Sequence, residues 1–182
     1  LAVAPSWATS LSPSPHNEAA YPFFTNRNAV ILAELGAGYY FHDIDAHLNL
    51  AFRAMNTGER AFGVEEQLSR TSIGLEGYKF LFDFHGFVPF VGAGLSYDIM
   101  RAEQREASLE TVEASGTALR PYIVFGWDIR ITNVDWFILR TNLRYTPDAT
   151  LTMPGTGQNL RFADFEFNFI QFVLNLNRFF AR

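Results

Sequence analysis

The strongest constraint on the fold of this chain is the alternation of apolar and polar residues between Arg120 and Tyr145. Successive side chains of a β-strand point to opposite faces of a sheet, so alternation with a period of two residues predicts strands. The segment divides into two arms around the turn Asn133-Val134-Asp135, and both arms carry one largely apolar and one more polar face. The pattern therefore predicts an antiparallel hairpin that separates two different environments.

Composition indicates that the apolar face lies at the surface of the molecule, where it contacts an apolar environment. Charged residues make up 18% of the 182 residues, below the roughly 25% of typical soluble domains, and aromatic residues make up 16%. No window approaches the roughly 20 uninterrupted apolar residues of a transmembrane helix. Large apolar residues outward, with small and charged residues inward, are typical of the strands of a membrane-spanning barrel.

The same alternation recurs along the chain and predicts an all-β fold, a transmembrane antiparallel up-and-down β-barrel of eight strands. Seven strands are expected within residues 29–182, and an even number requires one more from the first 28 residues. Leu1 to Ala8 could be that strand or the end of a secretory signal. Changes of phase near Gly77 and Ile170 predict local irregularities, the first of them a glycine bulge.

The connections between the predicted strands alternate between short and long. Short turns are expected at 42–45, 83–86 and 133–135, and long loops at 56–67, 100–119 and 147–159. Aromatic residues recur beside the short turns and again toward the long loops, as they do at the two interfaces of a membrane. Short periplasmic turns and long external loops predict a location in the outer membrane of a Gram-negative-type bacterium.

Charged residues on the inward faces are expected to form a network in the lumen, because side chains fill the interior of an eight-stranded barrel. A narrow ion path or gate is the alternative interpretation. The predicted network comprises Glu34, Arg53, Glu76, Asp98, Asp128, Arg130, Arg140, Arg144 and Glu166.

Outward apolar residues are expected to form a belt that faces lipid. The predicted belt comprises Phe52, Phe80, Phe82, Leu95, Tyr97, Phe125, Trp127, Ile129, Phe137, Leu139, Leu143 and Phe172. A soluble, lipocalin-shaped barrel would instead place apolar residues inside and polar residues outside.

The segments Pro89 to Tyr97, Arg120 to Tyr122 and Trp136 to Tyr145 resemble those of small outer-membrane barrels of the OmpA and OmpW type. The resemblance covers residues 29–180. It implies a structural, adhesive or partner-docking protein that acts through its external loops. A narrow conduit for small or hydrophobic solutes, as in the OmpW type, and a lipid-modifying barrel enzyme are alternatives that it leaves open.

Several kinds of chemistry are disfavoured by the sequence. The absence of cysteine excludes disulfides and thiolate sites, and a net charge of −5 without basic runs argues against a nucleic-acid partner. We expect no enzyme activity, no cofactor and no metal, although His42, His47 and His85 lie near acidic residues of the short turns. The expected partners are outer-membrane lipids, with another membrane or surface protein left open. The charged loop from Arg101 to Glu113 would be solvated, or would bind such a partner or a surface sugar.

Overall fold

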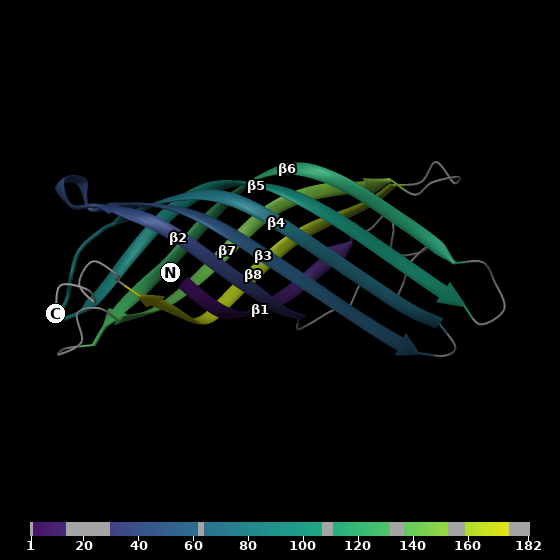
Figure 1. The fold of residues 1–182 in the computed structure, drawn as a ribbon, viewed down its shortest axis with the longest axis horizontal. Coiled ribbons are helices and arrows are strands. Elements are labelled where there is room, and N and C mark those ends of the chain that lie inside the picture. The colour runs from purple at the N-terminus through teal and green to yellow at the C-terminus, as the bar shows by residue number, and fades with distance from the viewer. Residues whose placement is uncertain are drawn as a thin grey trace.

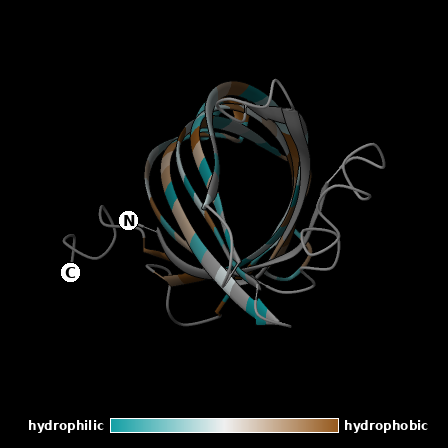
Figure 2. Ribbon diagram, turned by 90° about the vertical axis from the view of Figure 1, so that its right-hand side faces the viewer, coloured by the Kyte–Doolittle hydropathy of each residue, from teal (hydrophilic) through white to brown (hydrophobic). Residues whose placement is uncertain are grey.

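The protein is a closed barrel of eight antiparallel strands, each paired with its neighbours in the sequence, and the first strand also pairs with the last. The computed structural model describes residues 2–13, 30–61, 64–106, 111–131, 137–152 and 159–174. The strands are β1 (Ala2–Pro13), β2 (Val30–Phe41), β3 (Ala46–Ala61), β4 (Val64–Phe80), β5 (Phe87–Glu106), β6 (Val112–Arg130), β7 (Phe137–Thr152) and β8 (Asn159–Leu174). Figure 1 shows them inclined to the long axis, and Figure 2 shows the ring from one end. The predicted up-and-down fold is confirmed.

The expected eighth strand is present as β1, which is longer than the Leu1 to Ala8 segment in which we placed it. It pairs with β2 from Ala2 opposite Gly36 to Ala8 opposite Val30, and with β8 along its other edge. The segment 1–28, which we expected to hold a possible first strand and a loop before the barrel of residues 29–182, thus supplies the strand that closes the sheet. Leu1 and the residues 14–29 lie outside the described part of the chain.

Alternation along the strands places one set of side chains in the interior and the other on the outer surface. On β4, Glu76 and Tyr78 are buried, while Leu75 is half exposed to the outside. Glycines on the inner face make room for large partners: a Cβ on Gly94 would collide with the ring of Tyr122, and a Cβ on Gly126 would press on Phe90. The interior is therefore packed with long side chains opposite glycines.

The bulge that we predicted at Gly77 is absent. The pairing of β4 with β3 and with β5 continues without a register shift across Gly77, so its inward and outward faces never exchange. Tyr78 and Phe80 consequently lie inside, where the prediction placed them outside. The physical reason is that an aromatic cluster fills the interior at this end, and Tyr78 and Phe80 both pack on Phe90.

The phase change that we predicted near Ile170 is present on β8. The register between β7 and β8 shifts by one residue between the pairs Arg140–Gln171 and Asn142–Asn168. Gln171 is buried and Phe172 is exposed after the shift. This irregularity brings Gln171 into the interior.

The two ends of the barrel differ in the way their strands are joined. At one end lie the 3-10 turn η2 (His42–Ile44) and the tight turn before β5 (Figure 1). In the second turn His85 and Gly86 have positive φ, and the side chain of Asp83 accepts a hydrogen bond from the Gly86 amide at 2.9 Å. At the other end, the long loops expected at 56–67, 100–119 and 147–159 are largely strand. β5 has 20 residues and β6 has 19, about twice the 9–11 residues that cross a bilayer. The β3–β4, β5–β6 and β7–β8 hairpins therefore extend the barrel wall at this end.

Among the described residues, none of the helices combines the length and the apolar character needed to traverse a membrane. The interior combines an aromatic cluster near the short turns with buried polar residues along the rest of its length. This interior holds most of the charged residues that the sequence singled out.

Candidate functional site in the barrel interior

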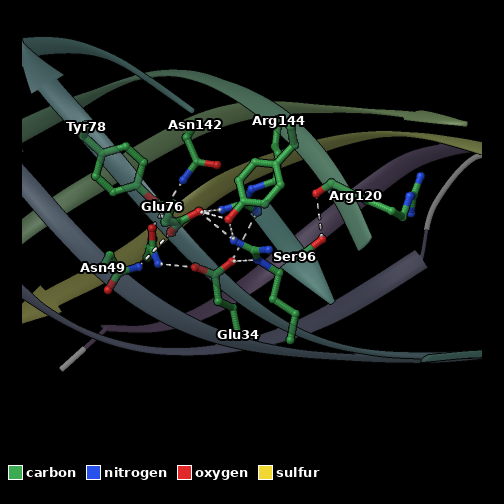
Figure 3. A network of polar contacts seen from close by, with 11 residues as sticks. Glu34, Asn49, Glu76, Tyr78, Ser96, Arg120, Asn142 and Arg144 are labelled. Carbon is green, nitrogen blue, oxygen red and sulfur yellow. Dashed lines mark hydrogen bonds and ion pairs between the residues drawn. The ribbon is translucent and has the colours of Figure 1, made fainter. Parts of the chain in front are cut away.

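The centre of the interior is a cluster of two carboxylates and two guanidiniums from four strands (Figure 3). Arg53 on β3 contacts Glu34 on β2 at 3.1 Å and Glu76 on β4 at 2.7 Å. Arg144 on β7 contacts the same two carboxylates, at 3.4 Å and 2.9 Å. No side chain of the four is more than 3% exposed. The cluster is electrically balanced, which is the condition under which buried charges are tolerated.

Neutral polar residues complete the coordination of Glu76. Its carboxylate accepts hydrogen bonds from Asn49 at 2.7 Å and from the hydroxyl of Tyr122 at 2.9 Å, and also from the hydroxyl of Tyr78. With the two arginines, Glu76 has five donors, which more than fills the roughly four lone-pair sites of an ionised carboxylate. The hydrogen-bonding capacity of the Glu76 carboxylate is therefore filled by side chains of the protein.

Glu34 is fixed from the opposite side of the barrel. Gln171 on β8 donates to Glu34 at 3.0 Å, and Asn142 on β7 donates to Gln171 at 3.3 Å. The one-residue shift in β8 places Gln171 on this face. Strands β2, β7 and β8 are thus joined through side chains as well as through the sheet.

Tyr122 lies between the two arginines of the cluster. The guanidinium carbons of Arg53 and Arg144 lie 5.0 Å and 5.2 Å from the centre of its ring. Both distances are within the range of favourable cation–π contact. The glycines at 74 and 94 leave the space that this ring occupies.

A second ion pair lies nearer the short turns. Arg140 makes a bidentate contact with Asp128, at 2.7 Å and 2.9 Å. Its guanidinium also lies 4.9 Å from the ring centre of Phe90 and 5.1 Å from that of Tyr78. Bidentate geometry with aromatic stacking is a strong form of arginine–carboxylate interaction. This pair joins the polar cluster to the aromatic cluster at that end.

A third ion pair lies toward the extended hairpins. Arg120 on β6 contacts Asp98 on β5 at 3.0 Å and donates to the carbonyl of Pro147 at 2.8 Å. Ser96 donates to the carbonyl of Arg120 at 3.4 Å (Figure 3). Both charged side chains are 2% exposed. Charge-paired side chains therefore occupy three successive levels of the interior.

The structure places most of the predicted lumen residues together in this interior. Glu34, Arg53, Glu76, Asp98, Asp128, Arg140 and Arg144 are all buried, with none more than 4% exposed. The side chain of Glu166 lies outside the described part of the structure.

Arg130 is an exception, and our placement of it in the lumen was wrong. It is the last residue of β6, so its long side chain passes the rim of the barrel and pairs with Asp83 of the neighbouring turn at 3.0 Å. Both side chains are nearly half exposed. A residue at the end of a strand can lie in phase with the inward residues and still be exposed, because a long side chain there can extend past the rim into water.

The outer surface carries most of the residues that we predicted for the belt. Phe52, Phe82, Leu95, Tyr97, Phe125, Ile129 and Phe172 are exposed, and Trp127, Phe137, Leu139 and Leu143 are half-buried. Phe80 is buried in the aromatic cluster and does not belong to this surface. Phe82 lies beyond the end of β4, next to a turn.

Sequence reasoning missed several members of the interior. Arg120 and Arg70 are buried, and both lie in phase with inward residues that we had assigned on their strands. Arg70 would have been found by extending the alternation one residue before the predicted strand, and Arg120 by continuing it to the first residue of the predicted hairpin. Asn49 was placed inward, but its bond to Glu76 could be recognised only once β3 and β4 were in register.

Among the described residues, potential metal ligands do not cluster, and two serine hydroxyls are bound to backbone carbonyls. No three His, Asp or Glu side chains in the part of the chain that the structure describes converge on one point. The hydroxyls of Ser96 and Ser69 donate to backbone carbonyls of Arg120 and Arg101. Neither is therefore held by a histidine, as a nucleophilic serine would be.

Comparison with solved structures shows the same fold in two surface proteins of bacteria. The chain is similar to Neisserial surface protein A, with a TM-score of 0.62 and 15% identity, over 96% of each chain. It is also similar to Ail, the attachment invasion locus protein of Yersinia pestis, with a TM-score of 0.56 and 9% identity, over 93% of this chain and 95% of that one. No protein-family model and no curated protein sequence matches this chain. The resemblance to small barrels of this type is thus confirmed at the level of the fold.

Proposed function

We propose that the protein is an integral barrel of the outer membrane of a Gram-negative-type bacterium, with a plugged lumen and an adhesive or partner-docking role. The observation that carries this proposal is the reversed polarity of the barrel. Phe125 is 46% exposed on the outer face, whereas Asp128 and Arg140 are at most 4% exposed in the interior. A soluble ligand-binding barrel would have the opposite arrangement, with apolar residues inside. Large exposed apolar faces mark contact with a membrane or another protein, and a band around a closed barrel suits lipid.

A plugged lumen is supported by the filling of the interior. Arg120, Arg144, Phe90, Gln171 and Glu76 are among the largest fully buried side chains, and they come from five different strands. An open channel would leave such side chains in contact with water. We therefore favour a closed barrel over a conduit for solutes.

A docking role is supported by the extended hairpins. On the β5–β6 hairpin, Arg101 contacts Glu103 at 2.9 Å and Glu113 at 3.2 Å, and Arg105 contacts Glu103 at 3.6 Å. The arginines and Glu113 are at least half exposed, so these pairs contribute little to stability. They form a polar, mixed-charge surface on a rigid projection, which suits recognition by a protein or a surface sugar. One of the two similar structures is an attachment protein.

Two measurements test the proposed location and the closed lumen. The purified protein should require detergent or lipid to remain dispersed in water. Reconstituted in planar bilayers, it should produce no discrete single-channel steps. Dispersion without detergent would contradict the membrane location, and reproducible steps that disappear when the protein is omitted would favour a conduit.

The docking role is tested by shortening the β5–β6 hairpin. Residues 103–113 are replaced by an Asn-Gly turn, which suits a two-residue hairpin connection between the paired Ala102 and Ala114. Bacteria that display this variant should adhere less to host-cell layers than bacteria that display the parent protein, at equal surface abundance. A matched control replaces Phe84, in a short turn at the other end, by Ser. Equal adherence of all three strains would contradict a role for this hairpin.

A further inference from the structure

Gly77 lies in the last, turn-proximal part of β4, three residues before the strand ends at Phe80, where the protein itself does not require a glycine. A Cβ added at Gly77 would meet nothing within 4 Å, whereas a Cβ at Gly74 or Gly94 would press on the side chain of Tyr122. Gly77 also has no positive φ, in contrast to Gly86. Glycine weakens the interior of a strand and often marks a place where a ligand approaches the backbone closely. The open space outside Gly77 is therefore a candidate place for a bound molecule.

A groove lies at this place on the outer face of β3, β4 and β5. Its volume is about 480 Å³, within the range of about 300–1,000 Å³ that small-molecule sites occupy. Leu48 lies opposite Gly77 and Val91 lies opposite Lys79 in the sheet, and Phe41 and Ile44 line the groove toward the short turns. These four side chains are between 41% and 58% exposed. The groove is thus apolar and begins at the end of the barrel that carries the tight turns.

The chain has a single lysine, and it lines this groove. Lys79 is exposed, and its ammonium donates a hydrogen bond to the carbonyl of Ile44. An ammonium has three N–H donors, so this bond fixes its position and leaves two for a ligand. The next residue, Asp45, uses its carboxylate to accept a hydrogen bond from the Tyr40 hydroxyl at 2.8 Å, a contact separate from the one that Lys79 makes. A cation is therefore held at the mouth of an apolar groove.

We propose that this groove binds one anionic glycerophospholipid, with an acyl chain across Gly77 and the phosphate on Lys79. The proposal rests on the membrane location proposed above. It follows from charge and depth together: Lys79 lies in the same row of the sheet as Phe41 and Val91, close to η2, while Leu48 and Gly77 lie one row deeper along the strands. A lipid of the leaflet around the short turns presents its phosphate and its chain in this order.

The proposal is tested by native mass spectrometry of the full chain in mild detergent. Phosphatidylglycerol, phosphatidylcholine and lipid A are added separately, and the bound fraction of each is measured. The parent should retain one phosphatidylglycerol in preference to phosphatidylcholine. The variant Lys79→Gln should lose about fivefold of this preference, as expected for one basic residue facing an anionic lipid. Gly77→Leu should lower the occupancy of both glycerophospholipids, because the new side chain fills the groove.

The matched control is Ala37→Leu, which adds the same kind of side chain to an exposed position on β2. It should bind lipid as the parent does, and far-ultraviolet circular dichroism should show that every variant is folded. Equal binding by all four proteins would overturn the proposal, as would a preference for lipid A. A dimer in detergent that is lost in Gly77→Leu would overturn it in favour of a second copy of the chain. These outcomes leave the membrane location intact, since that location is tested by the need for detergent.

Discussion

The guanidinium of Arg144 and the carboxylate of Glu34 lie 3.4 Å apart, although 110 positions separate them in the sequence. One is on β7 and the other on β2, and neither strand pairs with the other in the sheet. The contact therefore crosses the interior. It exists only when β8 and β1 have joined the two halves of the barrel, and it is one of two contacts through which Arg144 balances the buried carboxylates.

Removal of Arg144 should destabilise the barrel strongly. In Arg144→Met, Glu34 and Glu76 would share the single cation Arg53 within the cluster, and breaking a buried pair typically costs about 3–5 kcal/mol. Arg130→Met is the matched control, because the pair of Arg130 with Asp83 is exposed and should contribute about 0–1 kcal/mol. Urea unfolding of both variants in lipid vesicles measures the two losses. Similar losses would contradict the central role of the buried cluster.

A charge on the outer face should be costly in proportion to its depth in the membrane. Phe125→Arg introduces a guanidinium between the two ends of the exposed apolar surface, and the expected cost is about 2–4 kcal/mol. Leu119→Arg, which is nearer the extended hairpins, should cost about 0–1 kcal/mol. The free energies of unfolding in vesicles give the comparison. Equal costs at the two positions would show that neither faces the hydrocarbon layer.

Substitution of glycine by alanine should have opposite effects on the two faces of the sheet. Gly94→Ala places a methyl group against the ring of Tyr122, and such overpacking costs about 1–3 kcal/mol. Gly77→Ala places it in open space, and should be neutral or should stabilise by about 0.4–1 kcal/mol through the unfolded state. Thermal and urea unfolding measure the change in the free energy of unfolding, and its sign, for each variant. A strong loss at Gly77 would mean that its surroundings are not as open as described.

The orientation of the barrel can be read with single cysteines, because the chain has none of its own. Glu113→Cys lies on an extended hairpin, and Phe84→Cys lies in a short turn at the other end; both native side chains are at least half exposed. A membrane-impermeant maleimide added to intact cells should label position 113 only. Both positions should react after the outer membrane is permeabilised. Labelling of position 84 alone in intact cells would invert the proposed orientation.

The sequence predicts the barrel well because alternation reports directly on which face of a strand is buried. It fails where one residue type suits both faces. Tyr78 and Phe80 were placed outside because a change of phase was predicted near Gly77, and aromatic rings suit a lipid interface, yet the interior near the short turns is also aromatic. Arg130 failed for a related reason, since a long side chain at a rim can leave the face on which its Cα lies.

The extent of the strands was the second weakness of prediction. Polar residues toward the tips of the hairpins alternate without a clear apolar face, so the outer parts of β5 and β6 were read as a loop. Arg120 stood at the start of the predicted strand and was not assigned to the network. The contacts of the interior could not be derived at all. They depend on how far the sheet is sheared when it closes, and one-residue differences in register decide whether Gln171 meets Glu34.

The balanced cluster of Glu34, Arg53, Glu76 and Arg144 has a consequence for the biogenesis of the protein. The β3–β4 hairpin brings one cation and one anion, but β2 brings an anion and β7 brings the cation that matches it. Hairpins that entered lipid one after another would expose uncompensated charge to hydrocarbon at every intermediate stage. We therefore expect insertion to be concerted, with the sheet closing around its charges before the wall reaches the bilayer core.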